Sequence, residues 1–136
     1  MSKQAVLCVD DEKIVLDSLQ EQLENRFGSS FTYEIAESVD EAWDVIEDLV
    51  SDGFGIALVI SDWLMPRIKG DEFLVDLHQK YPETITVMLT GQADPDAIQN
   101  AMENANLFAY VKKPWRSDDL MERLAVVLSE KDFIKE

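Results

Sequence analysis

The chain has 136 residues, of which 46% are hydrophobic and 29% are charged, and this length and composition predict one folded domain over residues 1–136. Asp and Glu outnumber Lys and Arg by 28 to 12, which gives a formal net charge of −16. Such a charge repels nucleic-acid backbones and anionic lipid surfaces, so we expect no direct binding to nucleic acid or to a membrane.

Cys8 is the only cysteine. An internal disulfide and a multi-cysteine metal site are therefore excluded, and a small buried filler is the expected role of this side chain. The apolar runs of the chain are too short for a signal-peptide core or for the ~20 residues of a membrane span. These features together predict a soluble protein of the reducing cytoplasm.

Short apolar runs alternate with longer amphipathic stretches, a pattern that predicts a parallel sheet covered by helices on both faces. The first strand is expected over Gln4–Val9. A helix should follow, because apolar residues recur at helical spacing from Ile14 to Phe27, and Gly28 is a typical stop. The second strand is expected over Phe31–Ala36.

The second helix should begin at Ser38, which forms a capping-box pattern with Glu41. Asp52 and Gly53 should end this helix, and the third strand is expected over Gly55–Ser61.

A third helix is predicted after Gly70 and before Pro82, and a fourth strand over Ile85–Leu89. The pair Asp94-Pro95 is typical of a helix start and predicts the fourth helix. The fifth strand is then expected over Leu107–Val111.

Ser117 and Asp118 are candidate caps of a fifth helix, whose apolar positions continue to Ile134 and make it long. The fold class is therefore α/β, with a doubly wound (βα)5 arrangement of five parallel strands.

Polar residues follow four of the five predicted strands, and in an open parallel sheet ligands bind at this carboxyl edge. Asp10, Asp11, Asp62, Thr90 and Lys113 stand at these strand ends. Clustered carboxylates need a cation among them, and hard oxygen ligands without His or Cys favour Mg²⁺. The ammonium and the hydroxyl favour an additional anion with several oxygens, which a phosphoryl group provides.

All of these residues except Asp62 also have a simpler interpretation. Asp10 and Asp11 could only cap the first helix, Thr90 could bond locally to the backbone, and Lys113 could be an ordinary exposed lysine. Asp62 has no evident capping role, because it ends an apolar strand. The ordered set at successive strand ends therefore carries the prediction of a site, with Trp63 and Trp115 expected as its walls.

These motifs together resemble the receiver domain of two-component response regulators, the chemotaxis-type receiver family, over essentially the whole chain. In chain order, the matching pieces are Asp10-Asp11, Asp62-x-x-Met65-Pro66-x-x-x-Gly70, Leu89-Thr90-Gly91, Tyr110 and Lys113-Pro114. The resemblance implies the flavodoxin-like receiver fold with strand order 2-1-3-4-5.

By this resemblance, Asp62 is the phosphoryl acceptor, and the donor is a phosphohistidine of a sensor histidine kinase or phosphotransfer protein. The resemblance also implies Mg²⁺ bound by Asp11, Asp62 and the main-chain carbonyl of Leu64, with Asp10 acting largely through water. The expected protein is a signalling switch, and its own chemistry is limited to self-phosphorylation and slow self-dephosphorylation.

The resemblance assigns Lys113 and Thr90 to phosphate contacts and makes Tyr110 the aromatic part of the switch. It implies a cis bond between Lys113 and Pro114. The fourth helix, fifth strand and fifth helix would present the changed surface to a downstream output domain or protein, or to a second copy in a homodimer.

Two other classes of protein fit these residues less well. A Mg²⁺-dependent phosphohydrolase with Asp62 as nucleophile would need a second carboxylate two residues later, where Leu64 stands. A nucleotide-binding flavodoxin-like protein would need a phosphate loop after the first strand, where acidic residues stand instead. The residues of the site therefore favour the receiver interpretation over both.

Two further alternatives concern the output. The Thr90 and Lys113 segments resemble those of receivers fused to cyclic-dinucleotide phosphodiesterase or kinase domains, which favours a piece of a longer protein over a stand-alone regulator. Residues 129–136 could begin a linker helix that enters a coiled coil, or the fifth helix could pack on the sheet and fray after Leu128.

Overall fold

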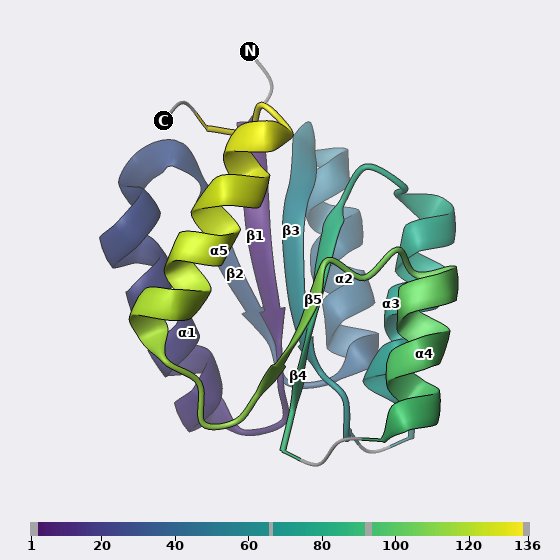
Figure 1. The fold of residues 1–136 in the computed structure, drawn as a ribbon. Helices are drawn as coiled ribbons and strands as arrows, with labels where there is room; N and C mark the ends of the chain where they lie inside the picture. The colour runs from purple at the N-terminus through teal and green to yellow at the C-terminus, as the bar shows by residue number, and fades with distance from the viewer. Residues whose placement is uncertain (1–2, 66, 92–93, 135–136) are drawn as a thin grey trace.

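The computed structural model describes residues 3–65, 67–91 and 94–134, and these form a five-stranded parallel sheet with strand order β2-β1-β3-β4-β5. All the strand arrows point to the same edge of the sheet (Figure 1). The fold class and the strand order implied by the family resemblance are therefore confirmed. The strands are β1 (Lys3–Val9), β2 (Thr32–Ala36), β3 (Phe54–Asp62), β4 (Ile85–Thr90) and β5 (Ala109–Lys112).

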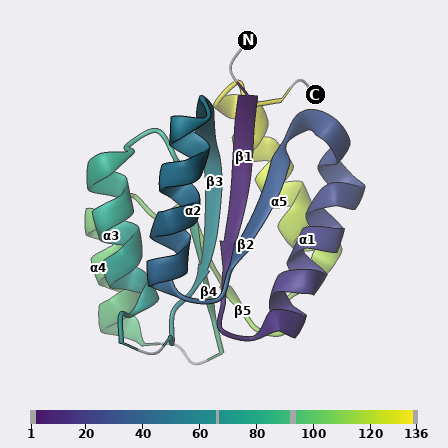
Figure 2. The ribbon, with the colours of Figure 1, turned by 180° about the vertical axis from the view of Figure 1, so that it is seen from behind.

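Helices cover both faces of the sheet, as the alternating pattern predicts. Helices α1 and α5 lie on one face, and α2, α3 and α4 lie on the other (Figures 1 and 2). Among the described residues, no helix combines the length and the apolar character needed to cross a membrane. The helices are α1 (Lys13–Phe27), the short 3-10 helix η1 (Gly28–Ser30), α2 (Val39–Ser51), α3 (Gly70–Lys80), α4 (Pro95–Asn104) and α5 (Ser117–Glu130).

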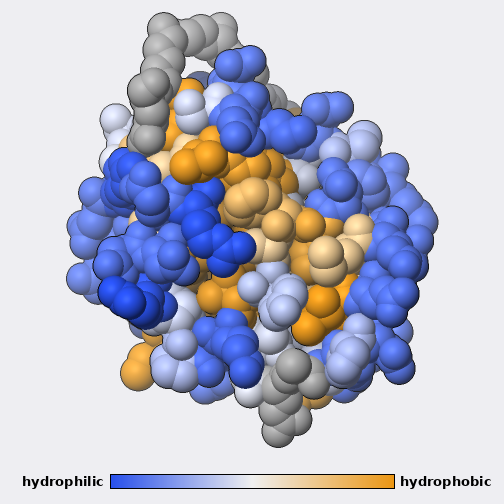
Figure 3. Space-filling view, viewed as in Figure 1, coloured by the Kyte–Doolittle hydropathy of each residue, from blue (hydrophilic) through white to orange (hydrophobic). Residues whose placement is uncertain are grey.

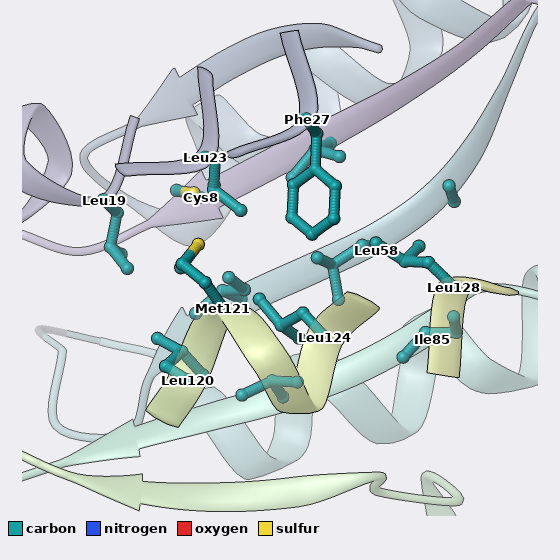
Figure 4. Close-up of a cluster of buried hydrophobic side chains, with 14 of the residues drawn as sticks. Cys8, Leu19, Leu23, Phe27, Leu58, Ile85, Leu120, Met121, Leu124 and Leu128 are labelled. Atoms are coloured by element: carbon teal, nitrogen blue, oxygen red, sulfur yellow. The ribbon is translucent and has the colours of Figure 1, made fainter. Parts of the chain in front are cut away.

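Each face of the sheet has its own hydrophobic cluster. On one face, Leu23 of α1 and Leu124 of α5 pack over Leu58 and other apolar strand residues (Figure 4). Cys8 is 2% exposed in this cluster, and burial, with a smaller effect from Asp10, raises the pKa of its thiol to about 12. The thiol is therefore a buried apolar filler, as predicted, and is not a reactive group.

A β-bulge in β3 changes which of its side chains face each of the two hydrophobic clusters. Ala5 of β1 pairs with Ile56, but the next residue, Val6, pairs with Leu58, so Ala57 is an extra residue in β3. Ala57 and Leu58 consequently belong to the same cluster, while Ile56 belongs to the other. The bulge lies in the middle of the strand and leaves its carboxyl end in regular pairing with β4.

The predicted N-cap of α2 and the predicted start of α4 at Asp94-Pro95 are confirmed. The Ser38 hydroxyl accepts a hydrogen bond from the Glu41 N–H at 3.1 Å, and the Asp94 carboxylate accepts from the Asp96 and Ala97 N–H groups. In a complete capping box, the Glu41 carboxylate would accept a hydrogen bond from the Ser38 N–H. Here it accepts from the N–H of Glu37 instead.

The start and the end of α5 differ from the prediction. Arg116 occupies the N-cap position without a side-chain cap bond, because the helix already includes Ser117 and Asp118. The helix ends at Glu130, where Asp132 has a positive φ of 63° and the Phe133 N–H donates to the Leu128 carbonyl at 2.9 Å.

The apolar pattern therefore does not continue as a helix to Ile134, and the structure agrees with the alternative of a fifth helix that packs on the sheet and ends soon after Leu128. The reason is packing: after the helix ends, Phe133 and Ile134 fold back against the hydrophobic cluster of α1 and α5. A linker helix over residues 129–136 stays a prediction for a longer chain, and its last two residues lie outside the described ranges.

Strand ends shift by one or two residues from the predicted positions. Asp62 and Thr90 are the last residues of β3 and β4. Sheet pairing therefore fixes the backbone from which each of the two side chains projects. The fifth strand begins at Ala109, and Leu107 lies before it, packed against the cluster of α2, α3 and α4. Pro66 of the predicted motif lies outside the described residues.

Candidate functional site

Three carboxylates converge at the carboxyl edge of the sheet. Asp10 and Asp11 follow β1, Asp62 ends the neighbouring β3, and one oxygen of each lies within 4.8 Å of those of the other two. Asp10 is fully buried and Asp62 is 4% exposed, whereas Asp11 is exposed. The topology thus brings together acidic residues that are about fifty positions apart in the sequence.

Lys113 supplies the positive charge of this edge. Its Nζ lies 2.7 Å from Oδ2 of Asp10 and 3.1 Å from Oδ1 of Asp62, with Oε1 of Glu12 farther away at 3.8 Å. Its main-chain N–H donates to the Thr90 carbonyl at 2.9 Å, which holds this part of the chain beside β4. The ammonium therefore lies between two buried carboxylates and partly neutralises both.

The electrostatics of the site leave an excess of negative charge. Burial, followed by the charge of Asp10, raises the pKa of Asp62 above its usual value, although Lys113 opposes the shift. Burial lowers the pKa of Lys113, but its hydrogen bond to Asp10 and the nearby charges of Asp62 and Asp10 outweigh this effect and raise it. The lysine therefore stays charged, and the site holds one ammonium against the four carboxylates of Asp10, Asp11, Asp62 and Glu12.

A divalent cation would fit this donor set. The carboxylates of Asp10, Asp11 and Asp62 are hard oxygen ligands within reach of one ion. Burial, followed by the charge of Asp10, raises the pKa of Asp62, and a cation among the carboxylates would favour its ionised form. The group of acidic residues could therefore bind a metal ion, and the absence of sulfur or imidazole ligands in it favours Mg²⁺.

The simpler interpretation of Asp10 as a helix cap is partly supported as well. Its Oδ1 accepts a hydrogen bond from the Glu12 N–H at 2.8 Å, while its Oδ2 bonds Lys113. Glu12 is the N-cap residue of α1 and has no side-chain cap bond of its own. Asp10 thus anchors the start of α1 and the ammonium of the site at the same time.

Close backbone contacts fix the chain around the end of β3. The Trp63 N–H donates to the Leu89 carbonyl at 2.9 Å, and the Trp63 carbonyl accepts from the Gly70 N–H at 2.8 Å. A Cβ atom at Gly70 would overlap the main-chain carbonyl of Asp62. The glycine of the predicted motif is therefore required by the approach of α3 to β3.

A cavity of about 470 Å³ opens beside Asp62. The sequence prediction did not assign Glu12 to the site, although its position after two acidic residues is a usable signal. Trp63 is a wall residue as predicted, but Trp115 is not, because its indole N–H donates to Gln22 of α1 at 2.9 Å. The cavity is lined by Asp11, Glu12, Asp62, Trp63, Leu64, Gly91 and Lys113.

The two predicted switch residues occupy different environments. Thr90 is 2% exposed at the end of β4 and contributes its carbonyl to Lys113. Tyr110 is 46% exposed on β5 and lines a separate groove with Met102 and Arg123. The structure therefore places Thr90 beside the site and Tyr110 on the surface. The predicted cis bond between Lys113 and Pro114 is confirmed.

Comparison with known proteins gives the family. The model of the response regulator receiver domain matches residues 6–125, which is most of the chain. The chain belongs to this family. The receiver fold, the acidic residues after β1 and the lysine after β5 are thus found together in one signalling domain of two-component systems.

The receiver is similar to two curated regulators. It is 33% identical over 119 residues to the response regulator Rre1 of Synechocystis, with 85% of the chain and 48% of Rre1 covered. It is 30% identical over 121 residues to the hydrogenase transcriptional regulatory protein HoxA of Cupriavidus necator, with 88% of the chain and 23% of HoxA covered. The receiver therefore spans no more than half of either relative.

Solved structures of receivers cover nearly the same length. A CheY-like receiver domain from Methanospirillum hungatei has a TM-score of 0.83 and 30% identity, covering 97% of this chain and 98% of that one. The receiver of an HD domain-containing protein from Pseudomonas fluorescens has a TM-score of 0.82 and 27% identity, with the same coverage. Both likenesses extend over the whole receiver fold.

Proposed function

We propose that this receiver accepts a phosphoryl group on Asp62 from a phosphohistidine of a sensor histidine kinase or phosphotransfer protein. The observation that carries the proposal is the position of Asp62, a buried carboxylate at the cavity, 3.1 Å from the Lys113 ammonium and beside Asp10 and Asp11. Family membership supports this kind of donor.

In the proposed reaction, an oxygen of the Asp62 carboxylate forms a bond to phosphorus. The P–N bond of the donor breaks, and its electron pair returns to the imidazole nitrogen. No general base is needed, because the attacking carboxylate is ionised. Lys113, already beside Asp62, would contact the phosphoryl oxygens. The Thr90 hydroxyl would donate a hydrogen bond to one of these oxygens once the phosphoryl group is attached.

We include Mg²⁺ in this proposal. Asp11, Asp62 and the main-chain carbonyl of Leu64 would hold the ion directly, and Asp10 would act largely through water. Support comes from the three convergent carboxylates and from Leu64 at the cavity wall. When bound, the ion would neutralise charge on the phosphoryl oxygens.

The output surface in this proposal is the face of α4, β5 and α5. Figure 3 shows hydrophobic side chains gathered near the middle of this face. Met102, Phe108 and Tyr110 line a groove there, and all three are exposed. We propose that phosphorylation changes this face through Thr90 and Tyr110, and that a downstream output domain or protein, or a second copy, docks on it.

The role that we propose is that of a cytoplasmic signalling receiver, whose own chemistry is limited to self-phosphorylation and slow self-dephosphorylation. The phosphohydrolase alternative is not favoured, because Leu64, 52% exposed at the cavity, stands where a second carboxylate would be needed. The chain matches only 23% of HoxA and 48% of Rre1, and a structural neighbour is the receiver of an HD domain-containing protein. These similarities support an output domain outside this segment.

The test is incubation with Mg²⁺ and acetyl phosphate, followed by intact mass measurement. Wild type should gain one phosphate, Asp62→Asn should gain none, and the exposed α3 control Asp76→Asn should behave as wild type. Equal gain in wild type and Asp62→Asn, or no gain in wild type, would reject the assignment of the acceptor.

A further inference from the structure

Both the main chain and the side chain of Trp63 have specific partners in other segments. It follows Asp62 directly and lines the cavity, and its main chain bonds both Leu89 and Gly70. Its indole N–H donates to Oδ1 of Asp71 at 3.1 Å, and the Lys69 ammonium lies 5.4 Å from the ring centroid. The orientation of the indole is thus fixed by a carboxylate on α3.

The same carboxylate also bonds a third segment. Asp71 is 8% exposed in the first turn of α3, and its Oδ2 accepts from Nδ2 of Asn100 on α4 at 2.9 Å. Helices α3 and α4 lie side by side (Figures 1 and 2). Asp71 therefore joins the segment after the acceptor to the middle of α4 with one oxygen for each partner.

The first-turn position alone does not explain this arrangement. A negative charge near a helix N-terminus is favourable, but an exposed Asp such as those elsewhere on the surface would provide that effect without burial. Burying a carboxylate is costly unless its oxygens are hydrogen-bonded, and here the two oxygens have partners from two different segments. Loss of either partner would leave a nearly buried charged oxygen without that bond.

We propose that Asp71 is a positioning residue that fixes the Trp63 indole at the cavity and couples it to the stability of α4. The functional part of this inference rests on the proposed phosphorylation of Asp62. A group that enters the cavity contacts a wall made in part by Trp63. Any shift of the indole changes its bond to Asp71, and Asp71 transmits the change to Asn100.

The first experiment measures amide hydrogen exchange of α4 in the ligand-free protein. Trp63→Phe keeps an aromatic ring but removes the indole donor, so α4 amides should exchange about tenfold faster, although Trp63 is not on α4. The matched control is Trp115→Phe, which removes the indole bond to Gln22 on the other face of the sheet and should leave α4 unchanged. Unchanged α4 exchange in Trp63→Phe, or equal acceleration in both variants, would overturn the coupling.

The reciprocal experiment follows the Trp63 indole N–H by ¹⁵N NMR. Asn100→Leu should shift this resonance and accelerate exchange of α4, although Leu favours a helix more than Asn does. Exchanging the two groups, with Asp71→Asn and Asn100→Asp together, restores an acceptor for the indole and a donor–acceptor pair between the helices. The exchanged pair should return both readouts toward wild type, and a resonance indifferent to Asn100→Leu or a pair that rescues neither readout would contradict the proposal.

A third measurement separates this inference from the function of Asp62. Mg²⁺ and beryllofluoride, a phosphoryl analogue, should alter α4 exchange in wild type, and the alteration should be at least halved in Asn100→Leu. If beryllofluoride binds but α4 responds equally in both proteins, the coupling is wrong while the acceptor assignment stands. If wild type takes up no phosphate from acetyl phosphate, the proposed function fails, and the ligand-free experiments still decide the role of Asp71.

Discussion

The central residue of the site is Lys113, because its charge makes the burial of two carboxylates tolerable. Asp10 has no exposed surface, and its Oδ2 lies 2.7 Å from the ammonium. A buried carboxylate that loses its partner retains most of the desolvation cost. The stability of this edge of the sheet therefore depends on a residue that the sequence offers mainly as a phosphate contact.

Replacement of Lys113 by Met should show this dependence. We expect Lys113→Met to lower the free energy of unfolding by about 3 kcal/mol, because Asp10 and Asp62 lose their shared ammonium. The adjacent Lys112 is exposed, so Lys112→Met should change stability by less than about 0.5 kcal/mol. Urea denaturation of both variants makes the comparison, and equal losses would refute the special role of Lys113.

Asp62 should make stability depend on pH in metal-free buffer. Its pKa is raised in the folded protein by burial and by Asp10, so the folded state holds this proton more tightly than the unfolded chain does. Stability from this group is then lost as pH rises from the usual value of 3.8 through the raised folded pKa.

Asp62→Asn removes that titration. The variant should melt at a higher temperature than wild type at neutral pH, and the difference should shrink in acid as Asp62 becomes protonated. A gap in melting temperature that does not vary with pH, or a variant less stable than wild type at neutral pH, would show that burial does not penalise the ionised form.

Among the helices and strands, the close approach of α3 to β3 sets the position of Asp62, the proposed acceptor. Gly70 has no room for a Cβ atom, whereas Gly91 at the end of β4 faces open space. Gly70→Ala should therefore cost about 3 kcal/mol as α3 shifts away from Asp62, while Gly91→Ala should stay within about 0.5 kcal/mol. Thermal unfolding compares the two, and a tolerated Gly70→Ala would mean that the contact relaxes easily.

The elements themselves could be predicted well, because the apolar runs are strong and the caps of α2 and α4 are local signals. Ser38 and Asp94 each bond N–H groups within three residues. The end of α5 could not be predicted in the same way. Phe133 fits a continuing helix by spacing, but its contact with the core is a tertiary effect that local spacing does not contain.

At the scale of the whole molecule, the net charge of −16 and the acidic edge make cation binding a source of stability. Mg²⁺ at about 100 times its Kd should add about 2.7 kcal/mol to the free energy of unfolding, provided that it binds only the folded protein. Asp11→Asn should lose most of this gain, and the exposed control Asp17→Asn should keep it. Melting curves with and without Mg²⁺ test this, and an equal gain in both variants would indicate nonspecific screening.

Topology explains why much of the site could be predicted. Parallel strands bring their carboxyl ends to one edge, so Asp10, Asp62 and Lys113 meet because each follows or ends a strand. The network of Asp71 and Asn100 could not be predicted, because it depends on how α3 and α4 pack. The surface position of Tyr110 likewise depends on a side-chain orientation that strand alternation alone does not define.

The most direct test of the account is to locate the acyl phosphate in the chain. After reaction with Mg²⁺ and acetyl phosphate, borohydride reduction converts an aspartyl phosphate to homoserine, which tandem mass spectrometry of peptides can place. We expect homoserine at position 62 and only in phosphorylated samples. Homoserine at Asp10 or Asp11 instead, or an unmodified Asp62 in protein that carries phosphate, would contradict it.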